Sequence, residues 1–213
     1  MNDDQLLRYN KSFRFISADT ETEGLNSFYH RPWQIAWSIT EGGKIISCKQ
    51  YHLRIPNLNV GKDAARITKF DLEYHNRVAR DPREVYEEFA VDWFDERNAI
   101  VLQNYYFDLN KIKVLERLLG INKYYNFNRR VYDTIPLSKA FRLGLNPPAD
   151  RDEYVKWQFS MLNFKQKGLK TGLETICKEF GIDFDHTQAH AAKYDVVKTS
   201  ELFQKLMWAV RVY

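Results

Sequence analysis

Two carboxylates, Asp19 and Glu21, stand two positions apart where a short apolar run ends. If that run is a β-strand, side chains two residues apart lie on the same face of it. Carboxylates held side by side repel each other, and a cation between them removes that cost. Oxygen donors of this kind suit Mg²⁺ or Mn²⁺. The pair is therefore a candidate metal site, and a solvated acidic turn is the alternative for the same residues.

A third carboxylate, Asp108, lies near the start of a helix expected over about residues 107–119. Ile112 and Leu115 follow it at helical spacing, so Asp108 shares their apolar face and points inward. An inward-facing acid without a partner is costly, which favours a ligand or a hydrogen-bonding partner. The alternative is an acid of the first turn that the helix dipole stabilises.

The last helix, expected over about residues 191–210, repeats this arrangement with Asp195. Residues that share its face are small or apolar: Ala192, Thr199 and Leu202. This acid therefore also points inward, towards a metal or a buried basic partner. His190 precedes Asp195 by five residues, which on one continuous helix separates two side chains by about 140°. The two converge only if His190 lies before the helix begins.

The pattern of apolar and turn residues predicts the elements that would hold these side chains. Strands are expected at residues 13–18, 34–40, 44–53, 99–102 and 131–133, and the first three should form an antiparallel meander. Helices are expected after the N-cap Asp81, at 107–119, after residue 133 up to Gly144, from the capping box at Thr171 to Gly181, and at 191–210. This order predicts an α/β fold, a mixed central sheet with helices on both faces.

Less regular segments separate these elements. Residues 56–81 read as loop with a short helix, and residues 145–170 read as a loop or insert with a basic second half. The lysines of that half, Lys165, Lys167 and Lys170, could contact phosphates or form a solvated surface.

Length and composition fit one folded domain, residues 1–213, with 44% apolar residues and a formal net charge of +4. That charge permits a polyanionic substrate without demonstrating one. Residues 1–11 are polar and no apolar run is long enough to span a bilayer, so we expect a cytoplasmic protein with no membrane partner. Cys48 and Cys177 have no His or Cys nearby, so zinc is not suggested.

Three segments together resemble the DnaQ-like superfamily of 3′→5′ exonucleases, in its DEDDh branch. Residues 19–25, Asp-Thr-Glu-Thr-Glu-Gly-Leu, are close to the family's Asp-x-Glu-Thr with a trailing Gly-Leu. Residues 104–108, Asn-Tyr-Tyr-Phe-Asp, match Asn-x-x-Phe-Asp, and His190 to Asp195 matches the His-x4-Asp form. Gln103 stands where many relatives have His. The resemblance covers about residues 13–206 and implies an RNase H-like fold.

The resemblance also implies a metal-dependent phosphodiester hydrolase that removes nucleoside 5′-monophosphates from single-stranded 3′ ends, of DNA in the leading interpretation. It implies two divalent ions, Mg²⁺ or Mn²⁺, with His190 as the general base. The implied metal ligands are Asp19, Glu21, Asp108 and Asp195. The implied substrate contacts are Thr22, Leu25, Asn104, Tyr105 and Phe107.

Other functions and partners stay open at this point. An RNA-trimming exoribonuclease of the same family, oligoribonuclease-like or RNase T-like, would differ in contacts to the terminal 2′-OH. A non-catalytic nucleic-acid-binding or scaffold protein could share the fold. Proofreading or repair would add a polymerase as partner, and residues 158–162, Gln-Phe-Ser-Met-Leu, loosely resemble peptides that bind bacterial sliding clamps.

Overall fold

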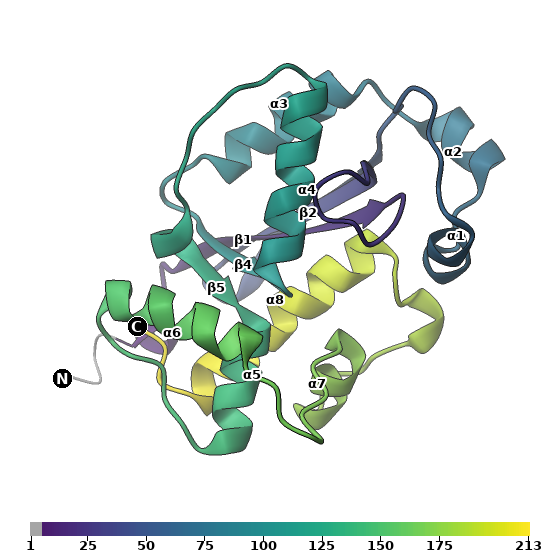
Figure 1. Cartoon of the computed structure of the whole chain (residues 1–213). Coiled ribbons are helices and arrows are strands. Elements are labelled where there is room, and N and C mark those ends of the chain that lie inside the picture. The colour runs from purple at the N-terminus through teal and green to yellow at the C-terminus, as the bar shows by residue number, and fades with distance from the viewer. Residues whose placement is uncertain (1–5) are drawn as a thin grey trace.

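The structure is a computed structural model that describes residues 6–213, so part of the polar segment expected at 1–11 lies outside the described residues. A five-stranded mixed sheet forms its centre, in the order β3-β2-β1-β4-β5 (Figure 1). The strands are β1 (Arg14–Thr22), β2 (Pro32–Glu41), β3 (Lys44–His52), β4 (Ala99–Leu102) and β5 (Val131–Asp133). The first three form an antiparallel meander, and β4 and β5 add in parallel. The expected mixed sheet is confirmed.

Helices cover both faces of the sheet (Figure 1). They are α1 (Lys62–Thr68), α2 (Leu72–Val78), α3 (Pro82–Trp93), α4 (Tyr105–Leu118), α5 (Thr134–Leu143), α6 (Arg151–Asn163), α7 (Leu173–Glu179) and α8 (Ala192–Ala209). Apolar residues of α3 and α4 share one core with the sheet, and those of α5, α7 and α8 share the other. No helix in residues 6–213 is both long enough and apolar enough to cross a bilayer.

The central strand β1 contributes to both cores by alternation. Ile16 and Ala18 belong to the core beneath α3 and α4, whereas Phe15 belongs to the core beneath α8. Ser17 also faces α8, where its hydroxyl lies 3.0 Å from that of Ser200. Because side chains alternate along a strand, every second residue after Ser17 also faces α8, and the residues between face α4.

β1 is longer than the pattern of apolar residues predicts. That pattern predicts a strand at residues 13–18, but β1 continues to Thr22 because β2 pairs with it along that length, up to Glu21 opposite Gln34. Asp19 and Glu21 therefore lie within a paired strand instead of a solvated turn beyond its end.

Residues 145–170 are not a loop throughout, which corrects the expectation of an irregular insert. Asp150 begins α6, because its carboxylate accepts the N–H groups of the first turn. The buried residues of α6 recur at helical spacing: Tyr154, Gln158 and Met161. A polar glutamine within this stripe conceals the periodicity. Residues 145–150 and the basic end of the segment, from Phe164 onward, are non-helical.

The position of Gln158 also bears on the clamp-like segment at 158–162. Its side chain is buried, and its oxygen accepts the N–H of Asp133 at 2.7 Å. The segment cannot bind a partner as an extended peptide while α6 is folded.

Two further expectations need correction. Residues 56–81 contain two short helices, α1 and α2, instead of one. Helix α7 follows Gly172, which offers no side-chain cap, so Thr171 and Glu174 do not form the expected capping box. Glu174 instead accepts from Lys178 one turn later, at 2.6 Å.

Candidate active site

Three carboxylates converge at the carboxyl end of the central strand. Asp19 and Glu21 come from β1, and Asp195 comes from the first turn of α8. One oxygen of each lies within 4.8 Å of one oxygen of the others. The alternation of β1 explains this convergence, because both strand residues lie on the face that α8 covers.

The charges of this cluster are uncompensated. Burial raises the pKa of Asp19 well above its ordinary value, and the neighbouring carboxylates raise it further. Burial and then Asp195 do the same to the pKa of Glu21. Burial raises the pKa of Asp195 to about 6. No lysine or arginine in residues 6–213 lowers these values, and one buried oxygen of Asp195, Oδ1, has no hydrogen-bond partner. Such an all-oxygen donor set fits a divalent cation.

Asp108 approaches the same strand from the opposite face. The hydroxyl of Thr20 donates to it at 2.8 Å, because Thr20 lies between the two strand carboxylates and faces α4. Burial raises the pKa of Asp108 to about 7. The side chain lies close enough to raise the pKa of Asp19, but it is outside the three-oxygen cluster. Of the four candidate metal ligands, three therefore lie together on the α8 side of β1, and Asp108 lies apart on the α4 side.

His190 lies just before α8, the position that convergence with Asp195 requires. Its backbone is left-handed, with φ of 62°, and its N–H donates to Oδ2 of Asp195 at 3.2 Å. Burial lowers the pKa of His190, and the neighbouring His186 and Lys69 lower it further. The imidazole is therefore neutral near pH 7 and can accept a proton.

The start of α8 is held by two glutamines of the sheet whose place in the sequence gives no sign of this role. Its own N-cap, Ala191, offers no side-chain bond. Gln34 accepts the N–H of Ala192 at 3.4 Å, and Gln50 accepts the N–H of Lys193 at 3.0 Å. These bonds satisfy donors that a helix N-terminus leaves free, and they tie the segment that carries Asp195 to β2 and β3.

A pair of histidines, of which His75 is buried and His52 half-buried, extends this contact. The amide nitrogen of Gln34 lies 2.7 Å from Nε2 of His52, and Nδ1 of His52 lies 3.2 Å from Nδ1 of His75. Because the oxygen of Gln34 accepts from α8, its NH₂ donates to His52, which in turn donates to His75. Burial, and then His75, lower the pKa of His52 to about 4. Both rings are neutral in this arrangement.

A cleft of about 600 Å³ opens over the three carboxylates, and we call it the carboxylate cleft. Its walls include His190, Phe107 of α4, Leu25 of the loop after β1, and Ile67 of α1. Leu25 is 88% exposed, so its apolar side chain stands free in the opening. Ile67 lies in residues 56–81, the segment that the sequence pattern predicts to be loop with a short helix.

The structure divides the five expected substrate contacts. Thr22, Leu25 and Phe107 line the carboxylate cleft, and Asn104 and Tyr105 do not. The ring of Tyr105 packs against the core under α4. Asn104 lines a neighbouring pocket instead.

The loop that carries Leu25 is fixed from below by Lys111, a fully buried residue of α4. Its ammonium group donates to the carbonyls of Asn26 at 2.7 Å, His30 at 3.0 Å and Gly24 at 3.3 Å. A Cβ at Gly24 would lie 2.5 Å from the ring of His30, so this close approach requires glycine. Lys111 thus ties this part of the cleft wall to α4.

Solved structures of exonucleases share this fold at low sequence identity. The zinc-bound E. coli exonuclease I–single-stranded DNA complex matches with a TM-score of 0.70 and 18% identity over 90% of this chain and 40% of that chain. Its complex with a dA16 oligonucleotide matches with a TM-score of 0.69, 18% identity and the same coverage. Cell-death related nuclease 4 matches with a TM-score of 0.63 and 15% identity over 91% of this chain and 63% of that chain. The chain thus spans 40% of the exonuclease I chains.

These neighbours share the RNase H-like α/β fold of this chain. The family model described as Exonuclease, RNase_T, matches residues 16–203, and the chain belongs to that family. The resemblance of the three sequence segments is thereby confirmed. No curated protein sequence matches the chain.

Proposed function

We propose that the protein is a 3′→5′ exonuclease that hydrolyses phosphodiester bonds at the 3′ ends of single-stranded DNA and releases nucleoside 5′-monophosphates. The observation that carries this proposal is the cluster of three uncompensated carboxylates beneath an open cleft, in a chain of the exonuclease family. The oligonucleotide complexes of E. coli exonuclease I support single-stranded DNA as the substrate. Proofreading or repair beside a polymerase would present such ends.

Two divalent cations, Mg²⁺ or Mn²⁺, are part of the proposal. Asp19, Glu21 and Asp195 would hold one, and the free Oδ1 of Asp195 is available to it. Asp19 would also serve the second, with Asp108 acting from the α4 side through water. Bound cations of this kind supply positive charge that activates water and stabilises the leaving 3′ oxygen.

His190 is the proposed general base. It lines the carboxylate cleft, and its lowered pKa leaves it unprotonated and able to take the proton of the attacking water. The bond from its N–H to Asp195 sets its place beside the carboxylates. Leu25 and Phe107 would contact the terminal bases from the cleft walls, with Thr22 at the floor.

Digestion of a 5′-labelled oligonucleotide with Mg²⁺, Mn²⁺ or a chelator tests the activity. We expect a ladder that shortens from the 3′ end with metal and no cleavage with the chelator. Asp19→Asn should abolish cleavage, whereas the exposed Asp152→Asn should retain it. Internal cuts, or near-normal cleavage by Asp19→Asn, would refute the proposal. Faster digestion of a matched RNA would assign the enzyme to the RNA-trimming relatives, and metal-independent binding without cleavage would indicate a scaffold.

His190→Ala tests the general base separately. We expect turnover to fall by about 10²- to 10⁴-fold, the usual range for this kind of catalysis. The rise in melting temperature that Mg²⁺ produces should remain, because the three carboxylates are intact. If that rise disappears, His190 supports metal binding instead of proton transfer.

A further inference from the structure

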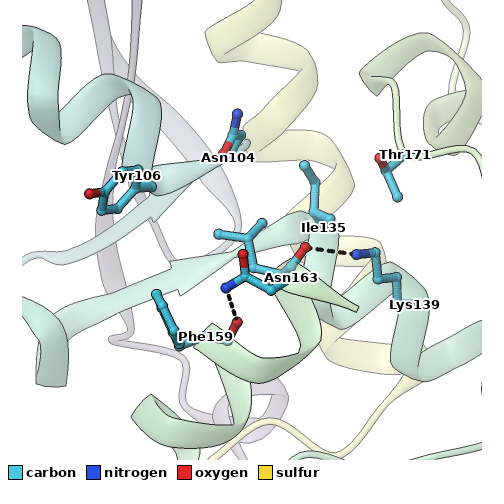
Figure 2. Close-up of a pocket in the computed structure, with 8 residues that line it drawn as sticks. Asn104, Tyr106, Ile135, Lys139, Phe159, Asn163 and Thr171 are labelled. Atoms are coloured by element: carbon cyan, nitrogen blue, oxygen red, sulfur yellow. Dashed lines mark hydrogen bonds between the residues drawn. The ribbon is translucent and has the colours of Figure 1, made fainter. Parts of the chain in front are cut away.

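A second pocket, of about 510 Å³, lies beside the carboxylate cleft and has the size of a small-ligand site (Figure 2). We call it the α4–α6 pocket, because its walls come mainly from the start of α4, from α5 and from the end of α6. The residues that line it include Asn104, Tyr106, Ile135, Phe159, Asn163 and Thr171. Two adjacent residues of α4 separate the two cavities: Tyr106 lines this pocket and Phe107 lines the cleft.

The wall from α6 is held in place by a buried lysine of α5. Lys139 is 5% exposed, and its ammonium group donates to the carbonyls of Met161 at 2.8 Å, Leu162 at 3.0 Å and Phe164 at 2.7 Å. Figure 2 shows its amino end directed at the last turn of α6. These are carbonyls that a helix C-terminus leaves without partners. All three donors of Lys139 are used, so this residue supports the wall and its ammonium has no donor left for a ligand.

The opposite wall, at Thr171, is bonded to the end of β4, where residues 104–108 begin. Gln103 directly follows β4 and precedes Asn104. Its amide nitrogen donates to the carbonyl of Thr171 at 2.8 Å, and its oxygen accepts the hydroxyl of Thr134. This link holds the end of the basic segment against the site.

The lining of the α4–α6 pocket suits an unpaired base. Tyr106 is 48% exposed and Phe159 is 55% exposed, so two aromatic rings are available for stacking. The side chain of Asn104 has no partner in residues 6–213, and Asn163 uses only its nitrogen, to the carbonyl of Phe159. The amide of Asn104 and the side-chain oxygen of Asn163 are thus available to hydrogen-bond a base edge, and no acidic residue lines the pocket.

The chain that leaves this pocket is basic. It exposes Lys165, Lys167 and Lys170, and none of these forms an ion pair within the described part of the chain. Proteins that bind single strands without sequence preference usually combine aromatic side chains, which stack on the bases, with basic residues that contact the phosphates.

We propose that the α4–α6 pocket binds a base of the single-stranded substrate on the 5′ side of its terminal nucleotide. The assignment rests on the proposed function, because a 3′ exonuclease places the last nucleotide at the carboxylates. Any second nucleotide site on that strand must then lie upstream. Tyr106 and Phe159 stack on this base, and the lysines of residues 165–170 contact its phosphates. Residues 145–170 thereby extend the substrate site.

Steady-state kinetics of Phe159→Ala on a single-nucleotide ester, the p-nitrophenyl ester of thymidine 5′-monophosphate, and on an oligodeoxynucleotide of about ten residues test this subsite. Phe159 is exposed on α6, so its removal should not impair folding. We expect KM for the longer substrate to rise about tenfold, within the range for removal of one stacking ring. KM for the single-nucleotide ester, which has no upstream base, and both kcat values should stay unchanged. Tyr124→Ala is the matched control, because Tyr124 is 97% exposed and lines neither cavity.

Equal effects of Phe159→Ala on both substrates, or none on the longer one, would overturn the subsite. Absence of cleavage by the wild type would instead refute the proposed function. In that case equilibrium binding of the longer oligonucleotide in chelator decides, and an unchanged Kd in the variant overturns the subsite. Replacing Lys165, Lys167 and Lys170 by Glu should reduce the slope of log affinity against log salt by about 0.7 for each phosphate that these lysines neutralise. An unchanged slope contradicts the phosphate contacts.

Discussion

Replacing one carboxylate of the cluster should stabilise the metal-free protein. The variant Asp195→Asn keeps the shape of the side chain and an oxygen that can accept the N–H of His190, while it removes one negative charge. In the wild type this charge is buried near Asp19 and Glu21 without a basic partner. We therefore expect the metal-free variant to melt at a higher temperature than the metal-free wild type.

The pKa of Asp195 sets the size of this effect. Burial raises it to about 6 in the folded protein, from an ordinary value of 3.8. Each pKa unit corresponds to about 1.4 kcal/mol, so the ionised side chain costs the folded state ~3 kcal/mol. For a chain of this length that difference corresponds to a rise in Tm of about 6–12 °C.

The sign of the pH dependence follows from the same values. The folded state holds the proton more tightly than the unfolded state, so the cost is absent below about pH 4 and grows as pH rises to about 6. Above that pH it is complete. The advantage of Asp195→Asn should therefore be largest at pH 7–8 and shrink as the pH falls towards 4.

Thermal unfolding in chelator and in Mg²⁺, from pH 4 to pH 8, measures both effects. The wild type should gain stability with Mg²⁺, by about 2.7 kcal/mol at a concentration one hundred times Kd, and Asp195→Asn should gain much less. The control Asp152→Asn, exposed on α6, should change stability by less than about 0.5 kcal/mol. If metal-free Asp195→Asn is less stable than the wild type at pH 8, the carboxylate makes a favourable contact and the argument from burial of an unpaired charge is refuted.

Two further predictions concern residues that position the site. Gln34→Leu removes the bonds to His52 and to the first N–H of α8, so Asp195 should shift. We expect kcat to fall about 10- to 100-fold with little change in KM. An unchanged kcat would show that Gln34 does not position Asp195. Lys139→Met leaves three carbonyls at the end of α6 without donors, so the free energy of unfolding measured in urea should fall by about 2–3 kcal/mol. A decrease below about 0.5 kcal/mol would mean that water replaces the ammonium there.

The sheet and the directions of the four carboxylates could be predicted because they depend on local periodicity. Strand alternation places Asp19 and Glu21 together, and helical spacing turns Asp108 and Asp195 inward. The convergence of His190 requires only that α8 begin after it, as it does. Spacing along one segment is sufficient for each of these inferences.

The contacts between distant segments could not be predicted in this way. The bond from Thr20 to Asp108 spans 88 positions, and nothing in either segment encodes it. Lys111, Gln34 and Gln50 read as ordinary polar residues, and only the packed chain reveals that they hold a cleft wall and the start of α8. The helix α6 escapes prediction for a related reason, because a buried polar residue interrupts its apolar stripe.

The carboxylates lie on two sides of β1, three towards α8 and Asp108 towards α4, because of the position of β1 in the sheet. β1 is the middle strand, so helices pack on both of its faces, and consecutive residues reach different helices. Asp19 and Glu21 meet α8, while Thr20 meets Asp108 of α4. A register slip of one residue would exchange these faces and disperse the cluster.

The interactions that fix the register of β1 are therefore also the interactions that form the site. β2 pairs with β1 over its full length, and Ser17 bonds to Ser200 of α8 two residues before the first carboxylate. Gln34, opposite Glu21, then holds the first turn of the same helix. One strand and its neighbour thus set both the spacing of the strand carboxylates and the position of Asp195 against them. The precision of the site comes from the sheet, and the carboxylates are held close together against their mutual repulsion until a cation neutralises them.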